Sequence, residues 1–189
     1  MIVFTVDASG TSAFGRLGET KGAIEILLSE AYARRDQVAL ISFKGNSAKI
    51  ELPPTRSLVQ TKKRLAALPG GGGTPLASGL EEAYNLAMKS RNRGITPTLA
   101  ILTDGKGNIA RDGSPGRDIA KRDTENLSKV IRASLIPSIV IDGVARADLK
   151  HRVQLHLRWW WWHANSPFRF RLLGGKLKKA QQTVLGCRE

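Results

Sequence analysis

Three oxygen-bearing side chains follow the first apolar run of this sequence at alternate positions. Asp7, Ser9 and Thr11 come directly after residues 2–6 in the stretch MIVFTVDASGTSAFG. Side chains of these types could cap a helix, supply a catalytic nucleophile or hold a hard metal ion such as Mg²⁺, which prefers oxygen ligands. The rest of the chain is needed to choose among these three kinds of chemistry.

Two more oxygen donors stand at similar places further along the chain. Thr74 follows the glycine run at residues 70–73, and Asp104 follows closely on the apolar run TLAIL at residues 98–102. Taken singly, each could be structural, because Thr74 could cap a helix and Asp104-Gly105 is a common turn. Together with the first three they supply two carboxylates and three hydroxyls, without sulfur or imidazole. This donor set favours a Mg²⁺ or Mn²⁺ site made of Asp7, Ser9, Thr11, Thr74 and Asp104.

Other chemistries lack a necessary part. The glycine run at residues 70–73 is not followed by the Gly-Lys-Ser/Thr of a phosphate-binding loop, and the early glycines do not have the GxGxxG spacing of a dinucleotide site. Ser9 as a nucleophile would need a histidine base, but the three histidines all lie between residues 151 and 163. We therefore expect no catalytic residue and no bound nucleotide in this chain.

Apolar runs alternate with helical patterns along most of the sequence. This alternation predicts an α/β fold, in which a doubly wound, mostly parallel sheet has helices on both faces and one short antiparallel edge strand. Strands are expected at residues 2–6, 37–43, 48–52 (the edge strand, ended by Pro53-Pro54), 98–102 and 138–141. Helices are expected at residues 17–33, from Thr55 or Ser57 to about 68, after a cap at Thr74, and at 117–133. Because ligands of such sheets bind at the carboxyl ends of the strands, the five metal-site residues should converge there.

Composition places the chain among soluble globular proteins. Hydrophobic residues make up 41% and charged residues 24% of the 189 residues. No stretch reaches the roughly 20 apolar residues of a membrane-spanning helix. The single cysteine, Cys187, fits a reducing compartment. We expect a cytoplasmic protein with no membrane partner.

The net charge of +14 is unevenly distributed. Residues 144–189 hold 10 Lys or Arg against 2 Asp or Glu, and they include four consecutive tryptophans. We therefore divide the chain into a domain at residues 1–143, which contains the metal site, and a basic, Trp-rich segment of uncertain structure at residues 144–189. The first part is only mildly basic, so nucleic acid is not expected as its partner.

The oxygen donors together resemble the metal-ion-dependent adhesion site of von Willebrand factor A domains. The similarity lies in Asp7-x-Ser9-x-Thr11, in Thr74 within a Gly-rich loop, and in a strand that ends in Thr-Asp104-Gly. It implies the Rossmann-like fold of that family. It also implies that Ser9, Thr11 and Thr74 bind the ion through their hydroxyls. Asp7 and Asp104 would bind mainly through waters or hold the hydroxyls in place, which leaves one position for a partner's carboxylate.

Longer stretches resemble a particular branch of that family, the C-terminal domains of magnesium chelatase D subunits. They include GRLGETKGAIEILLSEAYARRDQVALISFKG, LPPTRSLVQTKKRLAALPGGGGTPLASGL and TPTLAILTDGKGNIARDGSPGR, and the resemblance covers about residues 2–142. It implies a non-catalytic module in the ATP-dependent insertion of Mg²⁺ into protoporphyrin IX, during chlorophyll and bacteriochlorophyll synthesis. The module would couple the I-type ATPase subunit to the porphyrin-binding H-type subunit through an acidic side chain.

Three other interpretations stay open from the sequence. The chain could be a cobalt chelatase-type or other A-domain interaction protein. It could bind nucleic acid or an anionic surface through residues 144–189, with tryptophans stacking on bases and arginines on phosphates. It could also be a fragment that assembles with nothing.

Overall fold

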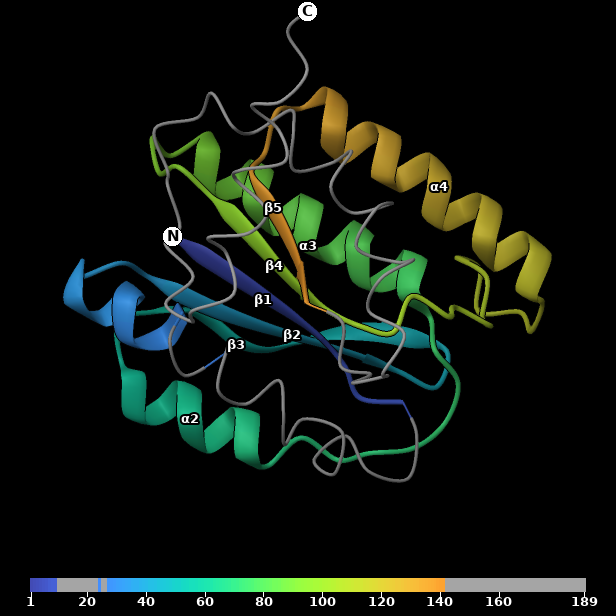
Figure 1. The fold of residues 1–189 in the computed structure, drawn as a ribbon, viewed down its shortest axis with the longest axis horizontal. Helices are drawn as coiled ribbons and strands as arrows, with labels where there is room; N and C mark the ends of the chain where they lie inside the picture. The colour runs from blue at the N-terminus through green and yellow to red at the C-terminus, as the bar shows by residue number, and fades with distance from the viewer. Residues whose placement is uncertain (10–23, 25–26, 142–189) are drawn as a thin grey trace, which may run out of the picture. The chain divides into compact units, whose positions relative to one another are not determined.

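The strands form one mixed sheet in the computed structural model, which describes residues 1–9, 24 and 27–141 (Figure 1). The strand order is β3-β2-β1-β4-β5. All neighbouring strands run parallel except β3, which is antiparallel to β2. The predicted doubly wound, mostly parallel sheet is confirmed. The strands are β1 (Ile2–Asp7), β2 (Val38–Lys44), β3 (Ser47–Thr55), β4 (Thr98–Leu102) and β5 (Ser138–Ile141).

Helices cover both faces of this sheet (Figure 1). They are α2 (Leu58–Ala66), α3 (Leu76–Arg91) and α4 (Arg117–Ala133), and residues 24 and 27–33 are also helical. Because side chains alternate along a strand, β1 sends Val3 into a hydrophobic cluster with α3 and sends Phe4 and Val6 into a second cluster on the other face. The two clusters fix the sheet between its helices. They also fix where the ends of its strands lie.

The edge strand β3 is longer than predicted. It continues through Pro53 and Pro54 to Thr55, which pairs with Val38 of β2 across an irregular register. The expectation that the two prolines end the strand is wrong. A proline lacks the N–H group that a central strand needs, but an edge strand has one side without a neighbour, and the missing donor is tolerated there.

Two residues, Ser57 and Thr74, were predicted as possible N-caps of α2 and α3. Ser57 caps α2, and its hydroxyl accepts a hydrogen bond from Gln60 N–H at 3.3 Å. Thr74 does not cap α3, because the N-cap is Pro75 and no side-chain cap bond is present. The hydroxyl of Thr74 is used elsewhere, as shown below.

Some sequence predictions lie outside the described residues. They include Thr11, the first part of the helix expected at residues 17–33, and the whole segment 144–189. Within the part of the chain that the structure describes, no helix combines the length and the apolar character needed to cross a bilayer.

Candidate metal centre

Three segments that are distant in sequence meet at the carboxyl edge of the sheet. β1 ends at Asp7, and its neighbour β4 runs parallel to it with Val6 opposite Leu102. The residues that follow the two strands therefore lie side by side. The glycine loop before α3 joins them, since Gly71 N–H donates to Ala8 O at 3.0 Å. Parallel pairing and this loop contact bring four of the five predicted site residues to one edge: Asp7, Ser9, Thr74 and Asp104.

A chain of hydrogen bonds connects three of these side chains. Asp7 Oδ1 accepts from the backbone N–H of Ser9 at 2.9 Å and from the Ser9 hydroxyl at 2.6 Å. The hydroxyl of Thr74 donates to Ser9 Oγ at 2.6 Å, across 65 residues of sequence. Thr74 is buried, with 7% of its surface exposed, so this contact is made inside the edge of the fold. The Thr74 hydroxyl is therefore bonded to Ser9 and is not used to cap α3.

Thr103, which was not predicted from the sequence, also contacts the candidate site. Its hydroxyl donates to Asp7 Oδ2 at 3.2 Å and accepts from the N–H of Gly105 at 3.1 Å. Asp104, the next residue, accepts from the N–H of Lys106 at 3.0 Å. The signal for Thr103 was the register: the residue after β4 lies opposite the residue that ends β1.

The carboxyl group of Asp7 is in a place that disfavours its negative charge. Burial raises its pKa above the ordinary value. Hydrogen bonds from Ser9 and Thr103 lower the pKa again, but less than burial raises it, and the nearby charge of Asp104 adds to the rise. A cation bound between these groups would relieve the repulsion.

A second Asp-x-Ser turn in the same chain shows that the hydrogen bonds within the turn do not cause the raised pKa of Asp7. Asp112 Oδ1 accepts from the N–H and the hydroxyl of Ser114 at 2.9 and 2.6 Å, the same distances as at Asp7 and Ser9. Asp112 is exposed, and its pKa is lowered by these hydrogen bonds. The two turns share their geometry and differ in burial and neighbours. Burial and neighbouring charge at the end of β1, not the turn itself, therefore raise the pKa of Asp7.

The donor chemistry of this edge fits a hard divalent cation. No group of three or more His, Cys, Asp or Glu side chains suited to a metal occurs among residues 1–9, 24 and 27–141. A cation here would depend on the hydroxyls of Ser9 and Thr74 together with the carboxylates of Asp7 and Asp104. Hydroxyl and carboxylate oxygens suit Mg²⁺ and Mn²⁺.

The glycine loop brings Thr74 to the site by close backbone approach. A Cβ atom on Gly73 would lie 2.6 Å from Ile109 Cγ1 and 2.9 Å from Gly45 O, which real Cβ atoms do not tolerate. Gly72, at φ +91°, lies against the backbone of Gly45 as well. Only glycine fits between the β2–β3 turn and the segment after β4.

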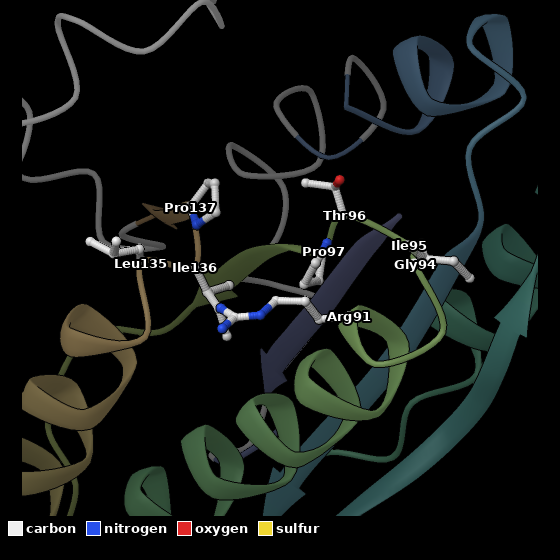
Figure 2. Close-up of a pocket in the computed structure, with 8 residues that line it drawn as sticks. All are labelled: Arg91, Gly94, Ile95, Thr96, Pro97, Leu135, Ile136 and Pro137. Atoms are coloured by element: carbon white, nitrogen blue, oxygen red, sulfur yellow. The ribbon is translucent and has the colours of Figure 1, made fainter.

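A pocket lies at the other edge of the sheet, before the amino ends of β4 and β5 (Figure 2). Its volume is about 230 Å³, and Pro97 and Pro137 contribute to its lining. Among the described residues that line it, Arg91 alone is ionisable, and its guanidinium donates to Ser134 O at 2.6 Å.

Comparison with known families matches residues 2–106 to the von Willebrand factor type A domain. Over 146 residues the chain is 58% identical to the magnesium-chelatase 60 kDa subunit of Cereibacter sphaeroides, a match that covers 77% of this chain and 26% of that protein. It is 53% identical over 148 residues to the 60 kDa subunit of Rhodobacter capsulatus, covering 78% of this chain and 26% of that protein. The chain thus spans about a quarter of the length of these relatives.

Among solved structures, the VWA domain of SpRpn10 shares the fold. The TM-score is 0.57 at 14% identity, and the match covers 75% of this chain and 73% of that chain. At so low an identity the likeness concerns the arrangement of helices and strands alone.

Proposed function

The chain belongs to the family of von Willebrand factor type A domains, and on that premise we propose that it is a metal-dependent protein-interaction module of a magnesium chelatase. Support for the chelatase comes from the 58% and 53% identity to magnesium-chelatase 60 kDa subunits. Support for the metal comes from one observation above all: Asp7, Ser9 and Thr74 form a continuous hydrogen-bonded chain at the carboxyl edge of the sheet.

Each residue of the site has a distinct role in this proposal. The hydroxyls of Ser9 and Thr74, together with Thr11, are the direct ligands of Mg²⁺ or Mn²⁺. Asp7 orients the Ser9 hydroxyl through their 2.6 Å hydrogen bond, and Thr103 holds the other carboxylate oxygen of Asp7. Asp104 adds negative charge that favours a cation. Neutral ligands leave the ion electrophilic, so the metal would supply an open position for a carboxylate.

The acidic group would come from another chelatase subunit. We propose that an Asp or Glu of the I-type ATPase subunit or of the porphyrin-binding H-type subunit binds at the open position. The module would then couple ATP hydrolysis in one subunit to insertion of Mg²⁺ into protoporphyrin IX in the other, for chlorophyll or bacteriochlorophyll synthesis. The single cysteine of the chain is consistent with the cytoplasm.

Isothermal titration with MnCl₂ and MgCl₂ tests the metal site directly. Asp7→Ala and Asp104→Ala should weaken Mn²⁺ binding by about 10-fold or more, in the range seen when groups that orient metal ligands are removed. Asp112→Ala is the matched control, because it removes an equivalent Asp-x-Ser turn whose side-chain bonds go to Ser114 and not to the candidate ligands. It should leave Mn²⁺ affinity unchanged.

A pull-down with purified ATPase subunit tests the interaction. The site variants are compared with the unaltered chain at constant Mg²⁺, because a chelator would also remove metal from the partner. Capture should be lost in Asp7→Ala and retained in Asp112→Ala. Equal capture by both variants would show that the metal site does not carry the interaction.

A further inference from the structure

The segment between β4 and α4 reaches back to the loop that carries Thr74. Within residues 103–116, which we name the β4–α4 loop, Ile109 and Pro115 form an isolated antiparallel bridge. The N–H of Gly116 donates to Asn108 O at 3.0 Å. The loop is therefore a closed hairpin with a defined shape.

Asn108 of this loop bonds to both polar backbone groups of Thr74. The N–H of Thr74 donates to Asn108 Oδ1 at 2.7 Å, and the N–H of Asn108 donates to Thr74 O at 3.1 Å. The hydroxyl of Thr74 donates to Ser9. Every polar group of Thr74 thus has a partner, with the side chain bonded within the site and the backbone bonded to Asn108.

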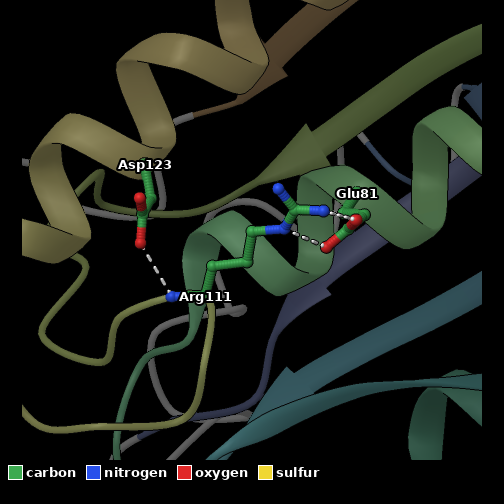
Figure 3. A network of polar contacts seen from close by, with 3 residues as sticks. All are labelled: Glu81, Arg111 and Asp123. Atoms are coloured by element: carbon green, nitrogen blue, oxygen red, sulfur yellow. Dashed lines mark hydrogen bonds and ion pairs between the residues drawn. The ribbon is translucent and has the colours of Figure 1, made fainter.

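The β4–α4 loop is itself attached to two helices through Arg111 (Figure 3). Its guanidinium makes two hydrogen bonds to the carboxylate of Glu81 in α3, at 2.8 and 2.5 Å. Its backbone N–H donates to Asp123 of α4 at 2.9 Å. Asn108 therefore projects from a support that is joined to both helices on this face of the sheet.

Thr74 needs such a support because the glycines of its own loop restrict the backbone very little. Gly71 and Gly72 lie at φ +117° and +91°, and a glycine backbone has more conformational freedom than any other. Metal ligands must be held within about half an ångström of their working position to bind well. Within the described part of the chain, the 2.7 Å bond to Asn108 Oδ1 is the shortest hydrogen bond made by the backbone of Thr74.

We propose that Asn108 is a positioning residue of the metal centre, which sets metal affinity by fixing the backbone of Thr74. This inference rests on the proposed metal site. Asn108 is exposed and, among the described residues, makes no hydrogen bond to Ser9 or Asp7, so its effect passes through Thr74.

The test combines Mn²⁺ titration with amide hydrogen exchange, read by NMR at Thr74 in the metal-free chain. Asn108→Ala removes the acceptor, and Asn108→Asp restores an oxygen at the same place. Asn108→Ala should weaken Mn²⁺ binding by about 10-fold and speed exchange at the Thr74 amide. Asn108→Asp should restore slow exchange and Mn²⁺ binding, and Asp112→Ala in the same loop should change neither.

The exchange measurement separates position from charge. Asn108→Asp also adds a negative charge, which could raise Mn²⁺ affinity on its own. Exchange is therefore measured in the metal-free chain, where slow exchange of the Thr74 amide reports chiefly on its hydrogen bond to residue 108. Unchanged Mn²⁺ affinity in Asn108→Ala, with the unaltered chain binding Mn²⁺, would overturn this inference and leave the metal site standing. Absence of Mn²⁺ binding by the unaltered chain would overturn both.

Discussion

At the scale of single residues, Asp7 combines its proposed role in the metal site with a cost to the stability of the fold. Its pKa is raised by burial and by the charge of Asp104, so folding disfavours its ionised form. Above the pKa of the folded state the carboxylate destabilises the metal-free protein. As the pH falls through that pKa towards the ordinary value, the group takes up a proton in the folded state and the penalty disappears.

Asp7→Asn should therefore stabilise the protein in EDTA at neutral pH. The amide oxygen can still accept from Ser9, while the unfavourable charge is gone. The thermal midpoint should rise by about 2–4 °C for each kcal/mol of relief, and the gain should shrink as the pH is lowered towards 4. At the same concentration, added Mg²⁺ should raise the midpoint of the unaltered chain more than that of Asp7→Asn. The difference in thermal midpoint between Asp7→Asn and the unaltered chain should thus be larger at pH 7 than at pH 4. A larger difference at pH 4 would contradict this account.

Thr5, two residues earlier in β1, carries a buried hydroxyl without a hydrogen-bond partner in the described part of the chain. Thr5→Val keeps the shape of the side chain and removes the unsatisfied group. We expect the free energy of unfolding to rise by about 1 kcal/mol, measured by urea denaturation. Thr61→Val is the matched control, because the Thr61 hydroxyl is equally buried but donates to Ser57 O at 3.0 Å. The control should lose stability, and a loss in Thr5→Val would mean that its hydroxyl has a partner.

At the scale of secondary structure, α3 packs very closely on the sheet at one point. A Cβ atom on Gly79 would lie 2.5 Å from Cδ1 of Phe43, a fully buried residue of β2. Gly79→Ala gains about 1 kcal/mol of helix propensity. It also forces the helix or the ring to move, which costs about 1–3 kcal/mol. Since both sites are buried, we expect the clash to prevail and the protein to lose stability.

Denaturation of the double variant identifies the cause of that loss. If the clash is responsible, Gly79→Ala should cost less in a Phe43→Ala background, where the added methyl group fills part of the cavity. Asn85→Ala, on the exposed side of α3, should stabilise slightly through helix propensity alone. If the losses in free energy of unfolding from Gly79→Ala and Phe43→Ala simply add in the double variant, the clash is not the cause.

The helices and strands were predictable where periodicity was strong. The helix at Arg117–Ala133 and the strands at Thr98–Leu102 and Ser138–Ile141 were predicted with the observed bounds. Predictions from the sequence were wrong where one residue type is common in two different structural settings. Prolines end most strands but not an edge strand, and Thr74 looks like a helix cap when its hydroxyl has a tertiary partner.

The residues of the candidate site were likewise only partly predictable from the sequence. Asp7, Ser9, Thr74 and Asp104 could be placed at one edge because parallel strands share their carboxyl ends. Thr103 and Asn108 could not be identified by pattern alone. Their roles depend on strand register and on a loop that folds back across 34 residues of sequence, and neither leaves a local signal.

At the scale of the whole molecule, the proposed metal site and most of the positive charge lie in different parts of the sequence. The four described site residues and both hydrophobic clusters lie within residues 1–141. Residues 144–189 carry 10 Lys or Arg against 2 Asp or Glu, which is more than half of the net charge of +14. Affinity for a polyanion should therefore depend on the basic segment, whereas affinity for Mn²⁺ should not.

Truncation after Ala145, the end of the first compact unit, tests this separation. The truncated chain should keep its Mn²⁺ affinity within about two-fold, because none of the described ligands is removed. It should elute from heparin at lower salt than the full chain, since each phosphate-like contact adds to the salt dependence of binding. If Mn²⁺ affinity falls with heparin affinity, the basic segment supports the metal site, and the two properties cannot be assigned to separate parts. If neither changes, the charge of residues 144–189 is neutralised within the folded chain and is not available to an external polyanion.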